Sequence, residues 1–195
     1  MGRVDCHFVF RALYGGAAEC GDTGLIKVDT EQCFLGLVDA LGHGRDAHII
    51  GCMARDYLDV NFRNDLVVTM QGLHRHLQGT KGVVAALCRI DLNTGDIRYV
   101  GIGNIAVKIL GPRTFSFAPR DGVIGYIIPT PREQHQKLGP GDILVMYSDG
   151  IQEHFDPLDC AGLFAGTAES IAHGLLEQFG KENDDASCIA LRYLI

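Results

Sequence analysis

The order of apolar and polar positions in the first half of the chain predicts two strand regions followed by two helices. Residues 4–14 are rich in aromatic and β-branched side chains, as expected of a strand. Residues 24–38 form a second strand region, and its last part, CFLGLV, is apolar enough for a strand buried on both faces. Apolar residues then recur at helical spacing over residues 47–76, and residues 61–64 are expected to divide this stretch into two helices.

The second half of the chain is mostly β in pattern. Five apolar runs follow one another from Gly82: VVAALCRID, IRYVGIG, IAVKILG, GVIGYIIP and DILVMYSD. The loop between the first two contains Gly95, which can adopt positive φ in a hairpin. Residues 167–180 predict a helix capped by Thr167, and SCIALRYLI predicts a last strand. This order favours a largely antiparallel α+β layered domain, and we expect residues 1–195 to form one domain.

The composition is that of an ordinary globular protein, with 47% apolar and 21% charged residues. The net charge of −7 and the lack of clustered Lys and Arg argue against nucleic acid as the main partner, because backbone binding requires such clusters. The seven cysteines have no regular spacing and their number is odd, which indicates reduced thiols.

The chain shows no targeting or membrane-spanning segment. No stretch approaches the ~20 apolar residues of a membrane helix. Asp5 and His7 interrupt the N-terminal residues before any apolar core, unlike a signal peptide. We therefore expect a cytoplasmic protein that does not bind membranes, and a monomer.

Aspartates mark the ends of the most apolar runs. They are Asp39 after FLGLV, Asp149 after DILVMYS, Asp184 and Asp185 before SCIALRYL, and Asp22 in the loop between the first two strand regions. Carboxylates beside buried runs are costly unless they are solvated, paired or bound to metal. Arg45 is the only basic residue within six positions of Asp39, and Asp149 has none.

Oxygen ligands of this kind suit hard cations such as Mg²⁺ or Mn²⁺ better than zinc or copper. The alternative interpretation is that each aspartate is a turn residue or a helix cap. It applies well to any one of them, and less well to the whole set, because every strongly apolar strand leads to an acid.

Four segments resemble, in order, motifs of the bacterial metal-dependent protein phosphatases of the SpoIIE type. They are Glu19-Cys-Gly21-Asp22, Val38-Asp39-Ala40-Leu41-Gly42-His43-Gly44, Leu144-Val-Met-Tyr-Ser-Asp149-Gly150-Ile-Gln-Glu153 and Asn183-Asp184-Asp185-Ala-Ser187. Each motif alone is modest evidence, but the ordered set spans residues 19–191 and therefore nearly the whole chain.

This resemblance implies a four-layer αββα sandwich, in which a central antiparallel β-sandwich is flanked by helices. It also implies two divalent cations, Mn²⁺ or Mg²⁺, at one end. By motif, Asp39 would bridge the two cations. Asp22 and the carbonyl of Ala40 would complete the protein ligands of one, and Asp149 and Asp184 would hold the other. Asp39 and Asp149 would thus act in catalysis through water activated by the metals.

The activity implied by the resemblance is hydrolysis of phosphoserine or phosphothreonine on another protein. Its phosphorylated substrates would be stressosome scaffold proteins, with the phosphatase as a feedback regulator of a bacterial stress pathway, or anti-sigma antagonist proteins. Members of this family often carry sensor, membrane or coiled-coil segments before the catalytic domain; because the motifs here begin at residue 19, we expect no separate regulatory domain.

The chain departs from the family pattern at two positions. Ala40 stands where the family usually has Gly, and a positive φ there would cost some strain. Leu41 stands where animal members have His, whereas His43 follows the bacterial branch, so we assign no general-acid role to His43. Arg11 is the candidate for phosphate binding, although no motif marks it.

Two other function classes stay open. A pseudophosphatase would keep the fold and bind a phosphoprotein without turnover; the retained aspartates argue against it, and Ala40 leaves it possible. A metal-dependent nuclease also uses clustered acids, but it requires basic surface that this composition hardly offers.

Several further signals are interpreted as structural. Residues 99–106 fit G-x-G-x-x-A, but β-branched residues follow where a dinucleotide site needs a helix, so a strand-turn-strand is expected. His74 and His76 do not share a helix face. Ser148 is interpreted as a turn hydroxyl, since it lacks the G-x-S-x-G elbow. The remaining isolated histidines are interpreted as surface or packing residues: His135, His154 and His173.

Overall fold

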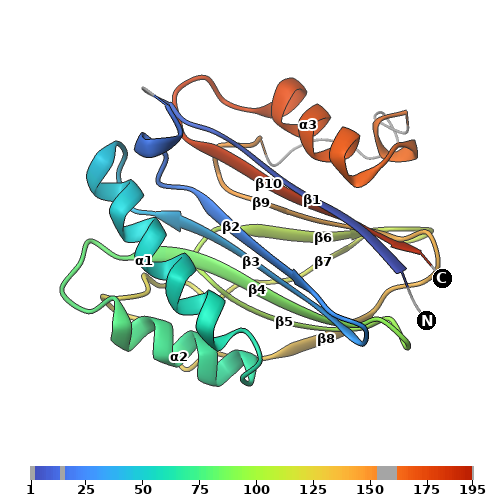
Figure 1. The fold of residues 1–195 in the computed structure, drawn as a ribbon, viewed down its shortest axis with the longest axis horizontal. Helices are drawn as coiled ribbons and strands as arrows, with labels where there is room; N and C mark the ends of the chain where they lie inside the picture. The colour runs from blue at the N-terminus through green and yellow to red at the C-terminus, as the bar shows by residue number, and fades with distance from the viewer. Residues whose placement is uncertain (1–2, 14–15, 153–161, 195) are drawn as a thin grey trace.

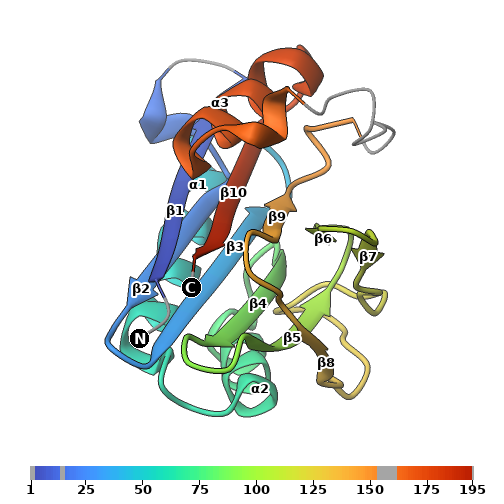
Figure 2. The ribbon, with the colours of Figure 1, turned by 90° about the vertical axis from the view of Figure 1, so that its right-hand side faces the viewer.

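The computed structural model describes residues 3–13, 16–152 and 162–194, and ten strands in this part form two five-stranded antiparallel sheets (Figures 1 and 2). One sheet has the order β1 (Arg3–Arg11), β10 (Ala186–Leu194), β9 (Ile143–Tyr147), β6 (Ala106–Leu110), β7 (Phe115–Ser116). The other has the order β2 (Thr23–Val28), β3 (Gln32–Ala40), β4 (Val83–Asp91), β5 (Asp96–Ile102), β8 (Gln134–Lys137).

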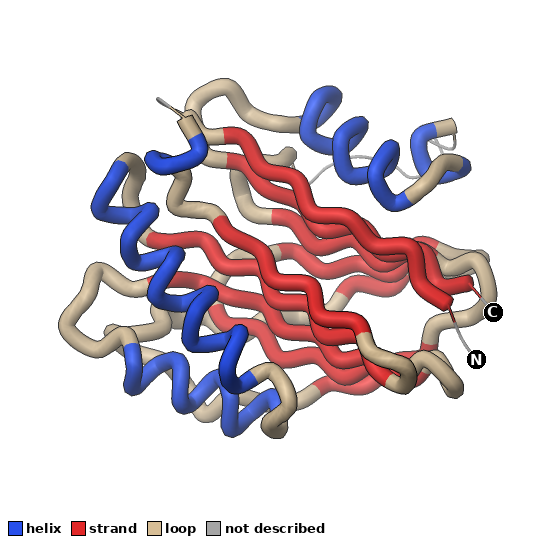
Figure 3. The backbone as a smooth tube through the Cα atoms, in the orientation of Figure 1, coloured by secondary structure: helices blue, strands red, loops and turns tan. Residues whose placement is uncertain are grey.

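Helices cover the outer face of each sheet. Helices α1 (Arg45–Asn61) and α2 (Leu66–His76) lie on the β2–β8 sheet, and α3 (Ala168–Phe179) lies on the β1–β10–β9 side of the other sheet (Figure 3). Two short 3-10 helices are Ala17–Glu19 and Leu163–Ala165. The predicted αββα sandwich, the break between the first two helices and the Thr167 cap of α3 are confirmed.

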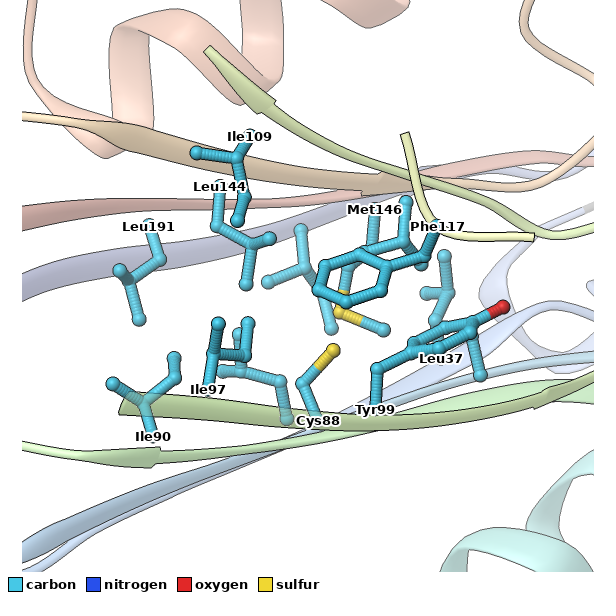
Figure 4. Packing of buried hydrophobic residues seen from close by; sticks show 14 of the residues in the cluster. Leu37, Cys88, Ile90, Ile97, Tyr99, Ile109, Phe117, Leu144, Met146 and Leu191 are labelled. Atoms are coloured by element: carbon cyan, nitrogen blue, oxygen red, sulfur yellow. The ribbon is translucent and has the colours of Figure 1, made fainter. Parts of the chain in front are cut away.

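The interior between the sheets is an apolar layer. Leu37, Cys88 and Tyr99 face Leu144 and Met146 across it, as Figure 4 shows. Strand β3 is buried on both faces over its apolar run, as predicted, because α1 covers its outer side. This packing holds the ends of β3, β9 and β10 in fixed relative positions.

The strand predictions differ from the structure in four places, and two of these are the short strands β7 and β8, which were not predicted. The region 24–38 is a hairpin of two strands, because the Asp29 carboxylate accepts hydrogen bonds from the backbone N–H groups of Glu31 (2.9 Å) and Gln32 (2.8 Å) and turns the chain. The run GVIGYIIP is a loop with isolated bridges, of which one pairs Val83 with Ile124. This run therefore joins the sheet at a single bridge and does not form a further strand of it.

The cysteines of the described residues are free thiols: Cys6, Cys20, Cys33, Cys52, Cys88 and Cys188. Cys160, Glu153 and His154 lie outside the described residues. Within the described ranges, no helix has both the length and the apolar character needed to cross a membrane.

Candidate metal centre

Three strand ends bring the predicted aspartates to one end of the sandwich. Asp39 is the next-to-last residue of β3, Asp149 follows β9 by two residues, and Asp184 precedes β10 by two. Strands β9 and β10 are neighbours, and the backbone N–H of Ser148 donates to the Ser187 carbonyl at 3.1 Å. The two sheets therefore each contribute carboxylates to the same rim.

A cavity of about 500 Å³ opens at this rim. Asp39, Asp149 and Asp184 all line it. Its other walls are Leu41, Gly42, His43, Val84, Gly103, Asn104, Asp121, Gly122 and Val123. Lys and Arg do not occur among these lining residues.

Asp22 lies behind the cavity, where it is only 5% exposed. Its carboxylate accepts a hydrogen bond from the Ser148 hydroxyl at 2.5 Å. Ser148 in turn accepts from the backbone N–H of Ser187 at 3.0 Å. The interpretation of Ser148 as a turn hydroxyl is therefore wrong: the side chain is buried and orients a predicted metal ligand, which only the tertiary fold places beside it.

Electrostatics couple these acids strongly. Burial raises the pKa of Asp39 to about 9, and the charges of Asp22, Asp149 and Asp184 add to the effect. Burial raises the pKa of Asp22 to about 6, although hydrogen bonds from Ser148 and Ser187 oppose the shift. Burial and then the charge of Asp149 raise the pKa of Asp184.

Asp185 supports the centre without facing the cavity. It is 5% exposed, and its two carboxylate oxygens accept from the backbone N–H groups of Leu13 and Gly21, both at 2.7 Å. Helix α1 packs on the same loop at Gly51, where any Cβ would lie 2.6 Å from the Gly21 carbonyl oxygen. These contacts fix the loop that carries Asp22.

The backbone of Ala40 is not strained. No non-glycine residue of the described chain has positive φ, and Ala40 continues β3. A Cβ placed on Gly21 would lie 3.2 Å from the Ala40 carbonyl oxygen, so that oxygen lies beside the loop leading to Asp22. The next residue, Leu41, donates its N–H to Gly82 at 3.0 Å.

The predictions missed two side chains of the cavity, Asn104 and Asp121. The Asn104 amide donates to the Asp149 carboxylate at 2.8 Å. Asn104 lies in the turn after β5, which also holds Gly103 at φ +100°, so the G-x-G-x-x-A segment is a strand-turn-strand as predicted. Asn104 directly follows the apolar run IRYVGIG but is an amide, and Asp121 does not follow such a run, so a search for acids at strand ends could not reveal either residue.

Arg11, the candidate for phosphate binding, does not line the cavity; its guanidinium donates to the Lys181 carbonyl. His43 does line it. His74 accepts a hydrogen bond from the Gly125 N–H at 3.0 Å, a packing role, and His135 pairs with Glu133 at 3.0 Å on the surface.

The sequence pattern described as Stage II sporulation protein E (SpoIIE) matches residues 29–194. The chain belongs to the SpoIIE family. The family predicted from the four motifs is thereby confirmed.

Two relatives illustrate the likeness of this SpoIIE-family chain to known proteins. A chain of a solved structure described as "The bacterial stressosome: a modular system that has been adapted to control secondary messenger signaling" is 33% identical, with a TM-score of 0.90 over 97% of this chain and 100% of that one. Phosphoserine phosphatase RsbX of Bacillus subtilis (strain 168) is 21% identical over 146 residues, 73% of each chain.

The fold agrees with solved members. RsbX in complex with magnesium superposes with a TM-score of 0.84 at 18% identity, over 97% of this chain and 95% of that one. The PP2C phosphatase domain of Bacillus subtilis SpoIIE gives 0.80 at 19% identity, over 99% of this chain and 62% of that one. At these identities the likeness establishes the shared fold.

The donor set of this SpoIIE-family chain fits hard divalent cations. Four carboxylates converge, and Asp39 resists ionisation as long as its neighbours are its only electrostatic partners. Bound cations would remove that penalty, and all-oxygen ligands are those that Mg²⁺ and Mn²⁺ prefer.

Proposed function

We propose that this chain is a metal-dependent protein phosphatase that hydrolyses phosphoserine or phosphothreonine. The observation that carries the proposal is the convergence of Asp39, Asp149 and Asp184 on one cavity, with Asp22 buried directly behind it. Membership of the SpoIIE family and the likeness to a phosphoserine phosphatase and to a PP2C domain support the same activity.

In this proposal Asp39 would be a ligand of both divalent cations, Mg²⁺ or Mn²⁺. Asp22 and the Ala40 carbonyl hold one of them, and Asp149 and Asp184 hold the other. The cation pair, when bound, supplies an activated water nucleophile and neutralises charge on the phosphoryl oxygens.

The neighbouring side chains orient these ligands. The Ser148 hydroxyl holds Asp22 in one rotamer from the buried side, and the Asn104 amide holds Asp149 from the cavity wall. Such outer hydrogen bonds typically control metal affinity by 10–100-fold. The acidic cavity alone would repel a phosphorylated side chain, so substrate binding depends on the cations.

The proposed substrates are phosphorylated proteins of a bacterial stress-signalling pathway, with a stressosome scaffold protein first and an anti-sigma antagonist second. The 33% identity to a chain from a stressosome study and the likeness to RsbX favour the scaffold protein. The phosphatase would then act as a feedback regulator that resets the phosphorylated scaffold.

Hydrolysis of p-nitrophenyl phosphate with and without Mn²⁺ tests the activity. Wild type should turn over only with Mn²⁺ or Mg²⁺, and Asp39→Asn and Asp149→Asn should each lower kcat at least ~100-fold. Asp56→Asn, at an exposed position of α1, is the matched control and should keep full activity. A wild-type protein without metal-dependent turnover would leave the pseudophosphatase interpretation in its place.

Incubation with phosphorylated scaffold and antagonist proteins from the same cell tests the substrate. Loss of one phosphosite, followed by mass spectrometry and absent with Asp149→Asn, identifies it. If p-nitrophenyl phosphate is hydrolysed but neither protein loses phosphate, the activity stands and the assignment of substrate fails.

A further inference from the structure

A second group of metal-ligating side chains lies between β1 and α3. It consists of His7 on β1 and of Glu169 and His173 on α3, and one ligand atom from each lies within 4.8 Å of the others. None of the three lines the acidic cavity. The interpretation of His173 as an isolated residue therefore does not describe the folded protein.

His7 lies on the face of β1 that packs against α3. Alternate residues of β1 share a face, and on this face Asp5 accepts a hydrogen bond from the Ala168 N–H at 2.7 Å while Val9 packs in the apolar cluster under α3. His7 lies between them. Its partner across the β1–β10 pair is Ala190, whose small side chain leaves room for the imidazole.

The helix supplies the other two ligands at the correct spacing. Glu169 and His173 are four residues apart and so lie on one face of α3. The rings of His7 and His173 are 5.5 Å apart at an interplanar angle of 40°. Asp5 at the helix start keeps α3 in register with β1, because its hydrogen bond fixes the first turn that contains Glu169.

We propose that His7, Glu169 and His173 form a Zn²⁺ site that is separate from the carboxylate centre. Two imidazole nitrogens and one carboxylate are a ligand set that zinc uses with water in the fourth position. His7 is half-buried and the two helix residues are exposed, and β1 is the edge strand of its sheet, so an ion has direct access.

The two centres differ in ligand chemistry and should select different ions. Imidazole favours zinc, whereas the all-oxygen carboxylate centre favours Mg²⁺ and Mn²⁺. Zinc at this group would join β1 to the first turns of α3, two elements far apart in the sequence. Because it binds the folded state only, it should raise the thermal stability of the sheet-and-helix layer.

Zinc titration of the full chain in excess Mg²⁺ tests the proposal, since Mg²⁺ occupies the carboxylate centre. We expect one equivalent of Zn²⁺ by calorimetry and a Tm increase of a few degrees. His7→Gln, Glu169→Gln and His173→Gln should each weaken that binding by more than the 10–100-fold typical of outer-shell changes. Glu177→Gln, one turn beyond His173 on α3, and His135→Gln on β8 are the controls and should bind as wild type does.

Cobalt gives a second readout that does not depend on stability. Co²⁺ added in excess Mg²⁺ should give the visible absorption of a tetrahedral nitrogen and oxygen site, absent in His173→Gln. Equal zinc binding in wild type and all three variants, or no zinc binding in excess Mg²⁺, overturns the proposal. Neither outcome affects the phosphatase assignment, which p-nitrophenyl phosphate measures separately.

Discussion

Single side chains decide the charge state of the acidic centre. Asp39 is partly buried and has three carboxylate neighbours, and its pKa rises to about 9. Without bound cations, ionisation of Asp39 therefore opposes folding. The residue proposed to bind both cations is thus one that should destabilise the metal-free protein, a trade-off common at functional sites.

Asp39→Asn should stabilise the metal-free protein in a pH-dependent way. The folded pKa of about 9 exceeds the unfolded value near 3.8, so the wild-type penalty is absent below pH ~4 and grows as the pH rises toward 9. Urea unfolding in a chelator should show similar stabilities at pH 4 and an advantage of at least ~1 kcal/mol for the variant at pH 8. Equal stability at both pH values would contradict the proposed charge coupling.

Ser148→Ala tests the buried hydrogen bond to Asp22. Loss of the hydroxyl removes a group that favours the charged carboxylate, so metal affinity should fall 10–100-fold. The stability cost should be roughly 1–3 kcal/mol, because Asp22 and the Ser187 N–H lose a partner. Isothermal titration with Mn²⁺ measures the affinity, and Ser116→Ala, on the exposed β7, should leave it unchanged.

At the scale of elements, two adjacent aspartates before β10 have different structural roles. Asp184 lines the cavity, whereas the adjacent Asp185 points into the protein and holds the loop that ends in Asp22. The start of β10 therefore carries one proposed ligand, Asp184, and positions a second, Asp22, which comes from the other end of the chain.

Asp184→Ala and Asp185→Ala should separate these two roles. Asp185→Ala leaves two backbone N–H groups without their acceptor and should cost roughly 2–4 kcal/mol of unfolding free energy. Asp184→Ala removes a half-buried acid of raised pKa, so stability should change by less than ~1 kcal/mol while Mn²⁺ binding is lost. Chemical denaturation measures the stability of both variants, and Mn²⁺ titration measures their metal binding. A large loss of stability in Asp184→Ala together with a loss of Mn²⁺ binding only in Asp185→Ala would contradict the assigned roles.

At the scale of the whole molecule, the core of the sandwich forms independently of the proposed cation site. The apolar layer between the sheets does not involve any of the proposed ligands. Folding should therefore survive metal removal, unlike that of small domains in which the metal replaces a core.

Chelation should lower the Tm without unfolding the protein at room temperature. With Mg²⁺ at ~100 times its Kd, binding to the folded state contributes about 2.7 kcal/mol, or roughly 5–10 °C in Tm for a chain of this length. Differential scanning calorimetry with Mg²⁺ and with EDTA measures the shift, which should vanish in Asp39→Asn. Loss of the far-UV circular dichroism signal on chelation would contradict the expectation that the core folds without the metals.

The sequence by itself determined most of the layer order and the family. The apolar runs that end in Asp39 and Asp149 are local patterns that extend over a few residues. They therefore predicted both the buried strands and the acids at the strand ends. The same local signal fails where the chemistry is a turn, as at Asp29, where a side-chain hydrogen bond divides one apolar region into two strands.

Only the tertiary structure decided which groups meet. Ser148 and Asp22 are 126 residues apart, and Asp185 and Gly21 are 164 apart, so no pattern along the chain could pair them. The same holds for His7 and His173, which β1 and α3 bring together at the sheet edge. Strand pairing and helix packing bring such distant side chains into contact, and those long-range contacts exist only in the folded chain.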